Sequence, residues 1–185
     1  MASGDLALTI LGFLAEEPMH GYELKQRIAE LSGHVRPVSD GALYPAIVRL
    51  EKSGMLNRRE EEGSGAAPRQ VLALTETGRE ELVRRLCEPS DLEISDRSRY
   101  FTLLAFLSVI PAEEQVRVLR RRLGFLETPA SFFYRSGSPV KAAETTDRFR
   151  RGMLVMAQAI STAEKEWLRS TIAELETGPP AASSS

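Results

Sequence analysis

The chain has 185 residues, of which 42% are hydrophobic and 27% charged, the composition of an ordinary globular protein with one domain or two small ones. Its net charge of −2 excludes a strongly basic protein that coats nucleic acid by bulk attraction, although a local basic patch stays compatible with it. Cys87 is the single cysteine, which excludes an intrachain disulfide and a zinc site built from cysteines. Cys87 is either a small apolar residue on a helix or a thiol that pairs between molecules.

The first apolar run, residues 6–15, follows Asp5 rather than a lysine or arginine, which is the wrong charge pattern for a signal peptide. No apolar stretch approaches the roughly 18 residues that a bilayer-spanning helix needs. We therefore expect a cytoplasmic protein with no membrane segment.

Helical spacing of apolar residues predicts three helices at the start of the chain. The first begins after Asp5, a possible cap, and is broken by Pro18. The second reads HGYELKQRIAEL and ends at Gly33. The third begins after Ser39, a residue type that caps helices well, and stops at Ser53-Gly54.

The pattern then changes to two strand-like runs, MLNRREE and RQVLALT, separated by the small-residue loop EGSGAAP. This predicts a hairpin. A fourth helix, TETGREELVRRL, follows with Thr75 or Thr77 as its cap and ends before Pro89. Three helices and a hairpin in this order are typical of a winged helix-turn-helix.

Beyond a polar connector at 88–96, every further element is predicted to be helical, including a long final helix over about 142–175. We expect a mainly α protein of three parts. A winged helix-turn-helix domain with a β-hairpin wing occupies residues 1–88. An all-helical domain for dimerisation and effector binding occupies 89–177, and a disordered tail occupies 178–185.

The third helix has the features of a helix that reads DNA. Gly41 leaves its first turn bare for close approach, its N-terminus favours a phosphate, and Tyr44 carries a hydroxyl on a stiff arm. Between Arg36 and Arg59 there are five basic and two acidic residues. The local excess of positive charge fits DNA contact, and it equally fits a solvated helix face.

The segments HGYELKQRI, GALYPAIVRLEKSGML and LTETGREEL, in this order and with a glycine-rich loop before the last, resemble the PadR family of bacterial transcriptional regulators. The resemblance covers residues 5 to about 87. The last helix resembles the C-terminal helical domain of the longer PadR-like proteins. The resemblance implies a homodimeric winged-helix regulator, usually a repressor, that a small-molecule effector often releases from a two-fold related double-stranded DNA operator.

Carried over by position, the resemblance implies phosphate contacts from the start of the second helix, major-groove contacts from the third helix and a contact from the wing. The candidate DNA-binding residues, including Gly41 from the argument above, are His20, Gly21, Tyr22, Ser39, Gly41, Tyr44, Arg49 and Arg69. His20 could instead cap the second helix. The wing departs from the family pattern, because Glu60, Glu61 and Glu62 open it where such wings generally present positive charge.

Apolar residues recur along the final helix at intervals of three and four, the spacing of a coiled-coil seam. They predict a dimer interface, with packing inside one chain as the alternative. This seam consists of Phe149, Met153, Met156, Ile160, Ala163 and Trp167.

Aromatic residues of the second half, among them Tyr100, Phe101 and Phe133, are candidates for an effector pocket, or else plain core. No catalytic triad or metal-ligand cluster is apparent, so we expect neither an enzyme nor a cofactor or metal. The alternative function is a winged-helix protein-interaction module that does not bind an operator. The operator sequence, the regulated genes and the ligand cannot be read from the residues.

Overall fold

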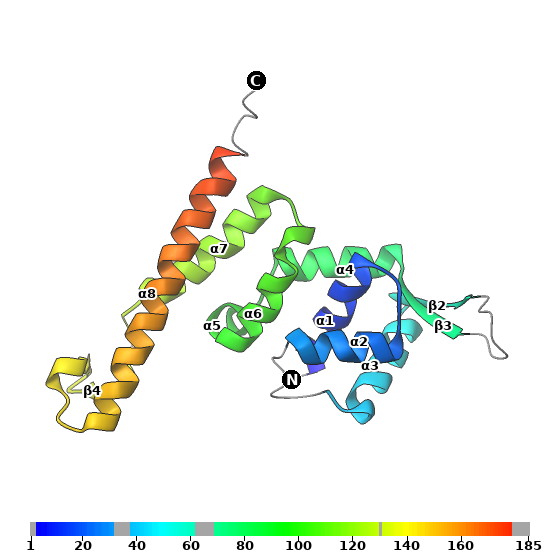
Figure 1. Cartoon of the computed structure of the whole chain (residues 1–185). Helices are drawn as coiled ribbons and strands as arrows, with labels where there is room; N and C mark the ends of the chain where they lie inside the picture. The colour runs from blue at the N-terminus through cyan, green and yellow to red at the C-terminus, as the bar shows by residue number, and fades with distance from the viewer. Residues whose placement is uncertain (1–2, 32–37, 62–68, 130, 179–185) are drawn as a thin grey trace, which may run out of the picture. The chain divides into compact units, whose positions relative to one another are not determined.

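The computed structural model describes residues 3–31, 38–61, 69–129 and 131–178 (Figure 1). It divides into two compact units, Met1–Ile110 and Pro111–Ser185. No helix within the described ranges is long and apolar enough to cross a membrane. The same residues hold no cluster of three or more histidine, cysteine, aspartate or glutamate side chains suited to a metal ion. The expected disordered tail lies, apart from Gly178, outside the described residues.

The first unit contains the predicted helices and hairpin in the predicted order. Its elements are α1 (Ser3–Glu16), β1 (Met19–His20), α2 (Gly21–Leu31), α3 (Asp40–Lys52), β2 (Leu56–Glu61), β3 (Arg69–Leu74), α4 (Glu76–Cys87), α5 (Asp91–Ser95), α6 (Arg97–Ala105) and the 3₁₀ turn η1 (Leu107–Val109). Helix α1 begins two residues before Asp5, the cap we expected. The expected connector contains α5, which begins in a capping box formed by Ser90 and Glu93.

The sheet has three antiparallel strands in the order β1-β3-β2. Strands β2 and β3 form the predicted wing hairpin, with Leu56 opposite Leu74 and Glu61 opposite Arg69. Strand β1 was not predicted, because two residues are too few for a period-two pattern. Its pairing sets His20 opposite Val71 and joins the start of α2 to the wing.

Helix α1 is the centre of the first unit, since it packs against α2, α3, α4 and α6. Its residues Ile10 and Leu11 are fully buried. At Gly12 a Cβ would lie 2.5 Å from the ring of Phe106, so only glycine lets that ring pack on the helix. This packing joins Phe106 to the first compact unit, which extends to Ile110. The domain boundary that we expected at residue 88 stays a prediction.

Helix α3 buries Leu43, Ile47 and Leu50 and turns its first turn to solvent. Ser39 occupies the predicted N-cap position, but its hydroxyl makes no cap bond. The N–H groups of Ala42 and Leu43 donate instead to its carbonyl, at 3.0 and 2.9 Å. The predicted cap residue is therefore confirmed by its position, whereas its side chain makes no cap bond.

Thr75 and Gly78 connect α4 to the turn that follows α3. The Thr75 hydroxyl donates to the Gly54 carbonyl at 2.6 Å and accepts from the Gly78 N–H at 3.1 Å, which makes Thr75 the cap of α4. Any side chain at Gly78 would collide with the Met55 carbonyl. The glycine of LTETGREEL is thus required by the close approach of two backbones.

We predict that Gly78→Ala lowers the free energy of unfolding by about 3 kcal/mol, because the Met55 backbone cannot move away without breaking the turn. Chemical denaturation followed by circular dichroism measures it. The matched control is Gly124→Ala in a helix of the second unit, where a Cβ meets nothing within 4 Å. That control should stabilise by about 0.5–1 kcal/mol through helix propensity, and equal effects of the two changes would contradict the packing argument.

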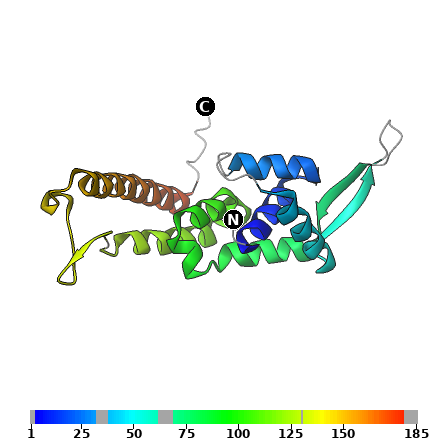
Figure 2. The ribbon, with the colours of Figure 1, turned by 90° about the horizontal axis from the view of Figure 1, so that it is seen from below.

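The second unit consists of α7 (Ala112–Glu127), the short strands β4 (Tyr134–Arg135) and β5 (Ser138–Pro139), the 3₁₀ turn η2 (Ala142–Glu144) and α8 (Arg148–Thr177). Our expectation that every element after the connector is helical is wrong at β4 and β5, which pair as a short antiparallel hairpin. Figure 2 shows α7 and α8 side by side, as their contacts also indicate. The final helix begins at Arg148 and not at the expected residue 142. The reason is the carboxylate of Asp147, which accepts bonds from the Phe149 and Arg150 N–H groups and so caps the start of the helix.

An ion pair is buried between α7 and α8. Arg122 donates through Nε to Glu164 Oε1 at 2.7 Å, and the two side chains are only 3% and 9% exposed. Apolar residues of the same two helices are also buried: Leu119 of α7, and Leu168 and Ile172 of α8. An ion pair placed this deeply favours the observed axial register of the two helices, because sliding one helix along the other would separate the two buried charges.

We expect Glu164→Leu to lower the stability of the second unit by about 3–5 kcal/mol, since it leaves the Arg122 guanidinium buried without its carboxylate. The double variant Arg122→Met with Glu164→Leu removes both charges and should recover most of that stability. Urea denaturation at one protein concentration compares them. A double variant as unstable as the single one would contradict the burial argument.

Candidate nucleic-acid interface

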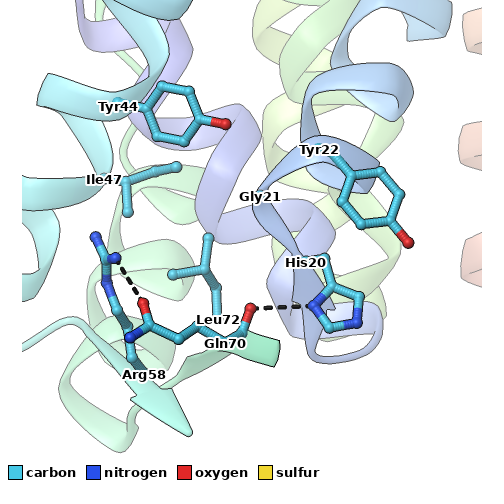
Figure 3. A pocket seen from close by; sticks show the side chains of 8 residues that line it. All are labelled: His20, Gly21, Tyr22, Tyr44, Ile47, Arg58, Gln70 and Leu72. Atoms are coloured by element: carbon cyan, nitrogen blue, oxygen red, sulfur yellow. Dashed lines mark hydrogen bonds between the residues drawn. The ribbon is translucent and has the colours of Figure 1, made fainter. Parts of the chain in front are cut away.

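The first unit has an open pocket of about 490 Å³ at the place where α2, α3 and the sheet meet (Figure 3). Five elements contribute to it: β1, α2, α3, β2 and β3. The lining residues are His20, Gly21, Tyr22, Tyr44, Ile47, Arg58, Gln70 and Leu72. Four of the eight predicted DNA-binding residues, His20, Gly21, Tyr22 and Tyr44, are therefore brought together.

His20 is held by the wing strand. Its Nδ1 lies 3.0 Å from the backbone carbonyl of Gln70, and a carbonyl can only accept, so Nδ1 carries the proton of this bond. The His20 ring stacks on the ring of Tyr22, with 5.5 Å between centroids and 11° between planes. Figure 3 shows both the bond and the neighbouring rings. The imidazole therefore has a set orientation, and our alternative of a helix-capping His20 finds no capping bond among the described contacts.

Gly21 lies against Tyr44 across the pocket. A Cβ at Gly21 would meet Tyr44 Cε1 at 3.5 Å and its hydroxyl oxygen at 3.9 Å, so alanine would fit but a larger side chain would push the ring aside. Tyr44 is 46% exposed and Tyr22 65% exposed. Two tyrosine hydroxyls at the rim of one pocket can donate to phosphate oxygens or to base edges.

Arg58 supplies the positive charge in the pocket lining, but it is paired. Its Nε and Nη2 donate to the two carboxylate oxygens of Glu51 at 2.5 and 2.9 Å, and its Nη1 donates to Gln70 Oε1 at 3.0 Å. The hydrogen bond from Arg58 to Glu51 raises the pKa of Arg58 above its ordinary value. This two-point contact joins the end of α3 to the wing and offsets one positive charge beside the pocket.

Three of the other predicted DNA-binding residues lie outside the pocket lining: Gly41 and Arg49 are exposed on α3, and Ser39 is exposed at its N-cap. The backbone of Arg69 pairs with Glu61 in the wing, but the side chains of Glu60, Glu61 and Arg69, and all of Glu62, lie outside the described part. The contacts that we predicted for the wing thus stay predictions.

Gln70 was missed as a site residue. It uses its carbonyl for His20 and its side chain for Arg58, so it connects two elements of the pocket. A period-two pattern in RQVLALT would have placed Gln70 and Leu72 on one face of the strand. The pairing of β1 with that strand had no comparable signal, so the bond to His20 could not be predicted.

Three helices followed by a β-hairpin wing define the winged-helix class of protein. The sequence model of the "Transcriptional regulator PadR-like family" matches residues 10–84. The transcriptional regulator Rv3488 of Mycobacterium tuberculosis is 39% identical over 89 residues, which cover 47% of this chain and 79% of that protein. The chain belongs to the PadR-like family of transcriptional regulators.

Two further likenesses differ in extent. Transcriptional regulator YqjI of Escherichia coli is 40% identical over 76 residues, 40% of this chain, and the match spans only 34% of that relative's length. The structure of Bacillus subtilis PadR in complex with operator DNA covers 92% of this chain and 98% of that one, with 19% identity and a TM-score of 0.44. That TM-score is too low to transfer geometry from one protein to the other.

Proposed function

We propose that this protein is a homodimeric, sequence-specific DNA-binding transcription regulator that acts as a repressor. The observation that carries the proposal is the pocket in which His20, Gly21 and Tyr22, at the start of α2, meet Tyr44 of α3. These are the residues for which the family resemblance implies DNA contact. A regulator needs no catalytic group, so the proposal includes no enzymatic activity.

Helix α3 is the proposed reading element. Its inner face is buried, whereas Gly41, Tyr44 and Arg49 are exposed on it and Ser39 is exposed at its N-cap. Pro45 has no N–H, so the exposed Gly41 carbonyl receives no α-helical bond from that position. The N-terminal part of the helix thus presents backbone groups and a tyrosine hydroxyl to a partner, as insertion into a major groove requires.

We expect Tyr44→Ala and Arg49→Ala each to weaken binding to a duplex from the protein's own upstream promoter by about 1–3 kcal/mol, because each removes a side chain that reads a base. Fluorescence anisotropy against a scrambled duplex separates specific from non-specific binding. The matched control is Arg79→Ala, an exposed arginine on α4 outside the pocket, which should leave specificity unchanged. Unchanged specific affinity in both α3 variants would refute α3 as the reading element.

The second half of the proposal is dimerisation through the seam of α8. Within one chain α8 buries a different face, Leu154, Leu168 and Ile172, and leaves the seam exposed. The exposed fraction of its large side chains runs from 42% at Ile160 to 75% at Phe149, and Ala163 is exposed as well. Intrachain packing thus does not account for the seam. Burial against a second copy would contribute about 1.5–3 kcal/mol for each large side chain, before the cost of association.

The dimer is tested by charges inside the seam. Met156→Glu with Ile160→Lys should give monomers and abolish tight binding to the promoter duplex, because a single winged helix offers a small footprint. The control is Gln158→Glu with Thr162→Lys, which places the same charges at the same spacing on α8 residues outside the seam. Sedimentation equilibrium should find the control dimeric. A seam variant that stays dimeric and still binds would contradict the proposal.

We also propose that a small molecule releases the protein from DNA, with Tyr100, Phe101 and Phe133 as candidate contacts. Tyr100 is fully buried in the first unit, so a ligand that touched its ring would have to displace core side chains. Phe101 is 47% exposed, with Arg97 5.1 Å from its ring centroid. Phe133 belongs to the second unit, where Arg150 lies 5.4 Å from its ring centroid. Phe101 and Phe133 are thus the more accessible candidates.

The second candidate function is a protein-interaction module without operator binding. It is favoured by the pairing of Arg58 with Glu51, which lowers the net positive charge beside the pocket, and by the acidic opening of the wing. A mobility-shift assay with the upstream promoter duplex separates the two functions. Absence of any shift at low salt would favour the interaction module.

A further inference from the structure

The hydrogen bond of His20 determines which of its nitrogens can donate to a ligand. Nδ1 donates its proton to the Gln70 carbonyl at 3.0 Å. A neutral imidazole has one N–H, so the Nε2 atom of neutral His20 is a bare acceptor. A phosphate oxygen only accepts hydrogen bonds, and neutral His20 therefore has no proton with which to bind it. A phosphate contact from Nε2 requires the imidazolium.

Two neighbours of His20 favour its imidazolium form, and one feature nearby favours an anion such as phosphate. The Tyr22 ring lies parallel to the imidazole at 5.5 Å, within the range at which an aromatic face attracts a cation. The Gln70 carbonyl also binds a charged donor more strongly than a neutral one. Opposing them, the positive end of the dipole of α2, which begins at Gly21, disfavours a cation and favours an anion.

The remaining titratable groups in the described pocket lining come from the elements packed against His20. Tyr44 of α3 contributes a phenol, and Arg58 of β2 contributes a guanidinium that is paired with Glu51. From β3 the lining contains the uncharged Gln70 and Leu72. With Arg58 offset by its carboxylate, an incoming phosphate would be the largest uncompensated charge at the pocket. Its negative charge would be attracted both to the imidazolium and to the positive end of the α2 dipole.

We propose that His20 contacts the DNA backbone as an imidazolium, so that each protomer takes up one proton from solvent at Nε2 when DNA binds. The proposal rests on the DNA-binding function above and adds the chemical form of one of its contacts. Because the contact is to the backbone, it is independent of sequence, and proton uptake should accompany specific and non-specific binding alike.

The experiment measures the dissociation constant between pH 6 and 8.5 at one salt concentration, with the upstream promoter duplex and with a scrambled duplex. Uptake of one proton per protomer predicts, by linkage, that affinity rises as pH falls, by up to about tenfold per protomer for each pH unit. Calorimetry in buffers of different ionisation enthalpy counts the protons directly.

Three variants test whether His20 causes the pH dependence of DNA affinity. In His20→Gln the amide nitrogen can reach the place of Nε2 and donates at every pH, so its affinity should be flat with pH and exceed the wild type at pH 8.5. In His20→Asn the amide nitrogen takes the place of Nδ1 and nothing takes the place of Nε2, so its affinity should be flat and weak. His34→Gln removes the chain's other histidine and should keep the wild-type pH dependence.

A wild-type pH dependence equal to that of His20→Gln would overturn the proposal while leaving DNA binding intact. Affinity that falls with falling pH would also overturn it, because Nε2 would then act as an acceptor towards a base. Failure of the wild type to bind either duplex at any pH would refute this inference together with the DNA-binding function.

Discussion

The pairing of a two-residue strand with the wing is the interaction on which the pocket depends. Met19 and His20 form β1, and their ladder with Leu72 and Val71 sets the start of α2 beside β3. Without that ladder, the Gln70 carbonyl would not be within reach of His20 Nδ1, and Tyr22 would not be stacked where it is. Two residues of main-chain pairing thus bring residues 50 positions apart into one site.

Two basic side chains beside the pocket are paired with carboxylates. The chain carries a net charge of −2, and the Arg58 guanidinium beside the pocket is held at two points by Glu51. Lys25 of α2 is likewise paired with Asp40 at the start of α3, at 2.7 Å. These two ion pairs lower the net positive charge beside the pocket.

Helix α8 has two different faces, one packed on α7 and one apolar and exposed. The face of α8 towards α7 contains the buried Glu164, whose bond to Arg122 favours the observed register, together with Leu168. The seam, which runs from Phe149 to Trp167 on another face of α8, is apolar and exposed. A helix of 30 residues with a satisfied inner face and an exposed apolar seam has apolar surface left over, and a second copy is the occupant we propose for it.

The sequence by itself determined helices α1 to α4, the wing hairpin and the family, because their signals are local: the helical spacing of apolar residues, the small-residue loop between two strand-like runs, and the family motifs. What only the tertiary structure decided was non-local. The pairing of β1 with β3, the collision that requires Gly78, and the burial of Arg122 with Glu164 each join residues distant in the chain. The same holds for the proton on Nδ1 of His20, since the carbonyl that accepts it belongs to a residue whose closeness no period or propensity could reveal.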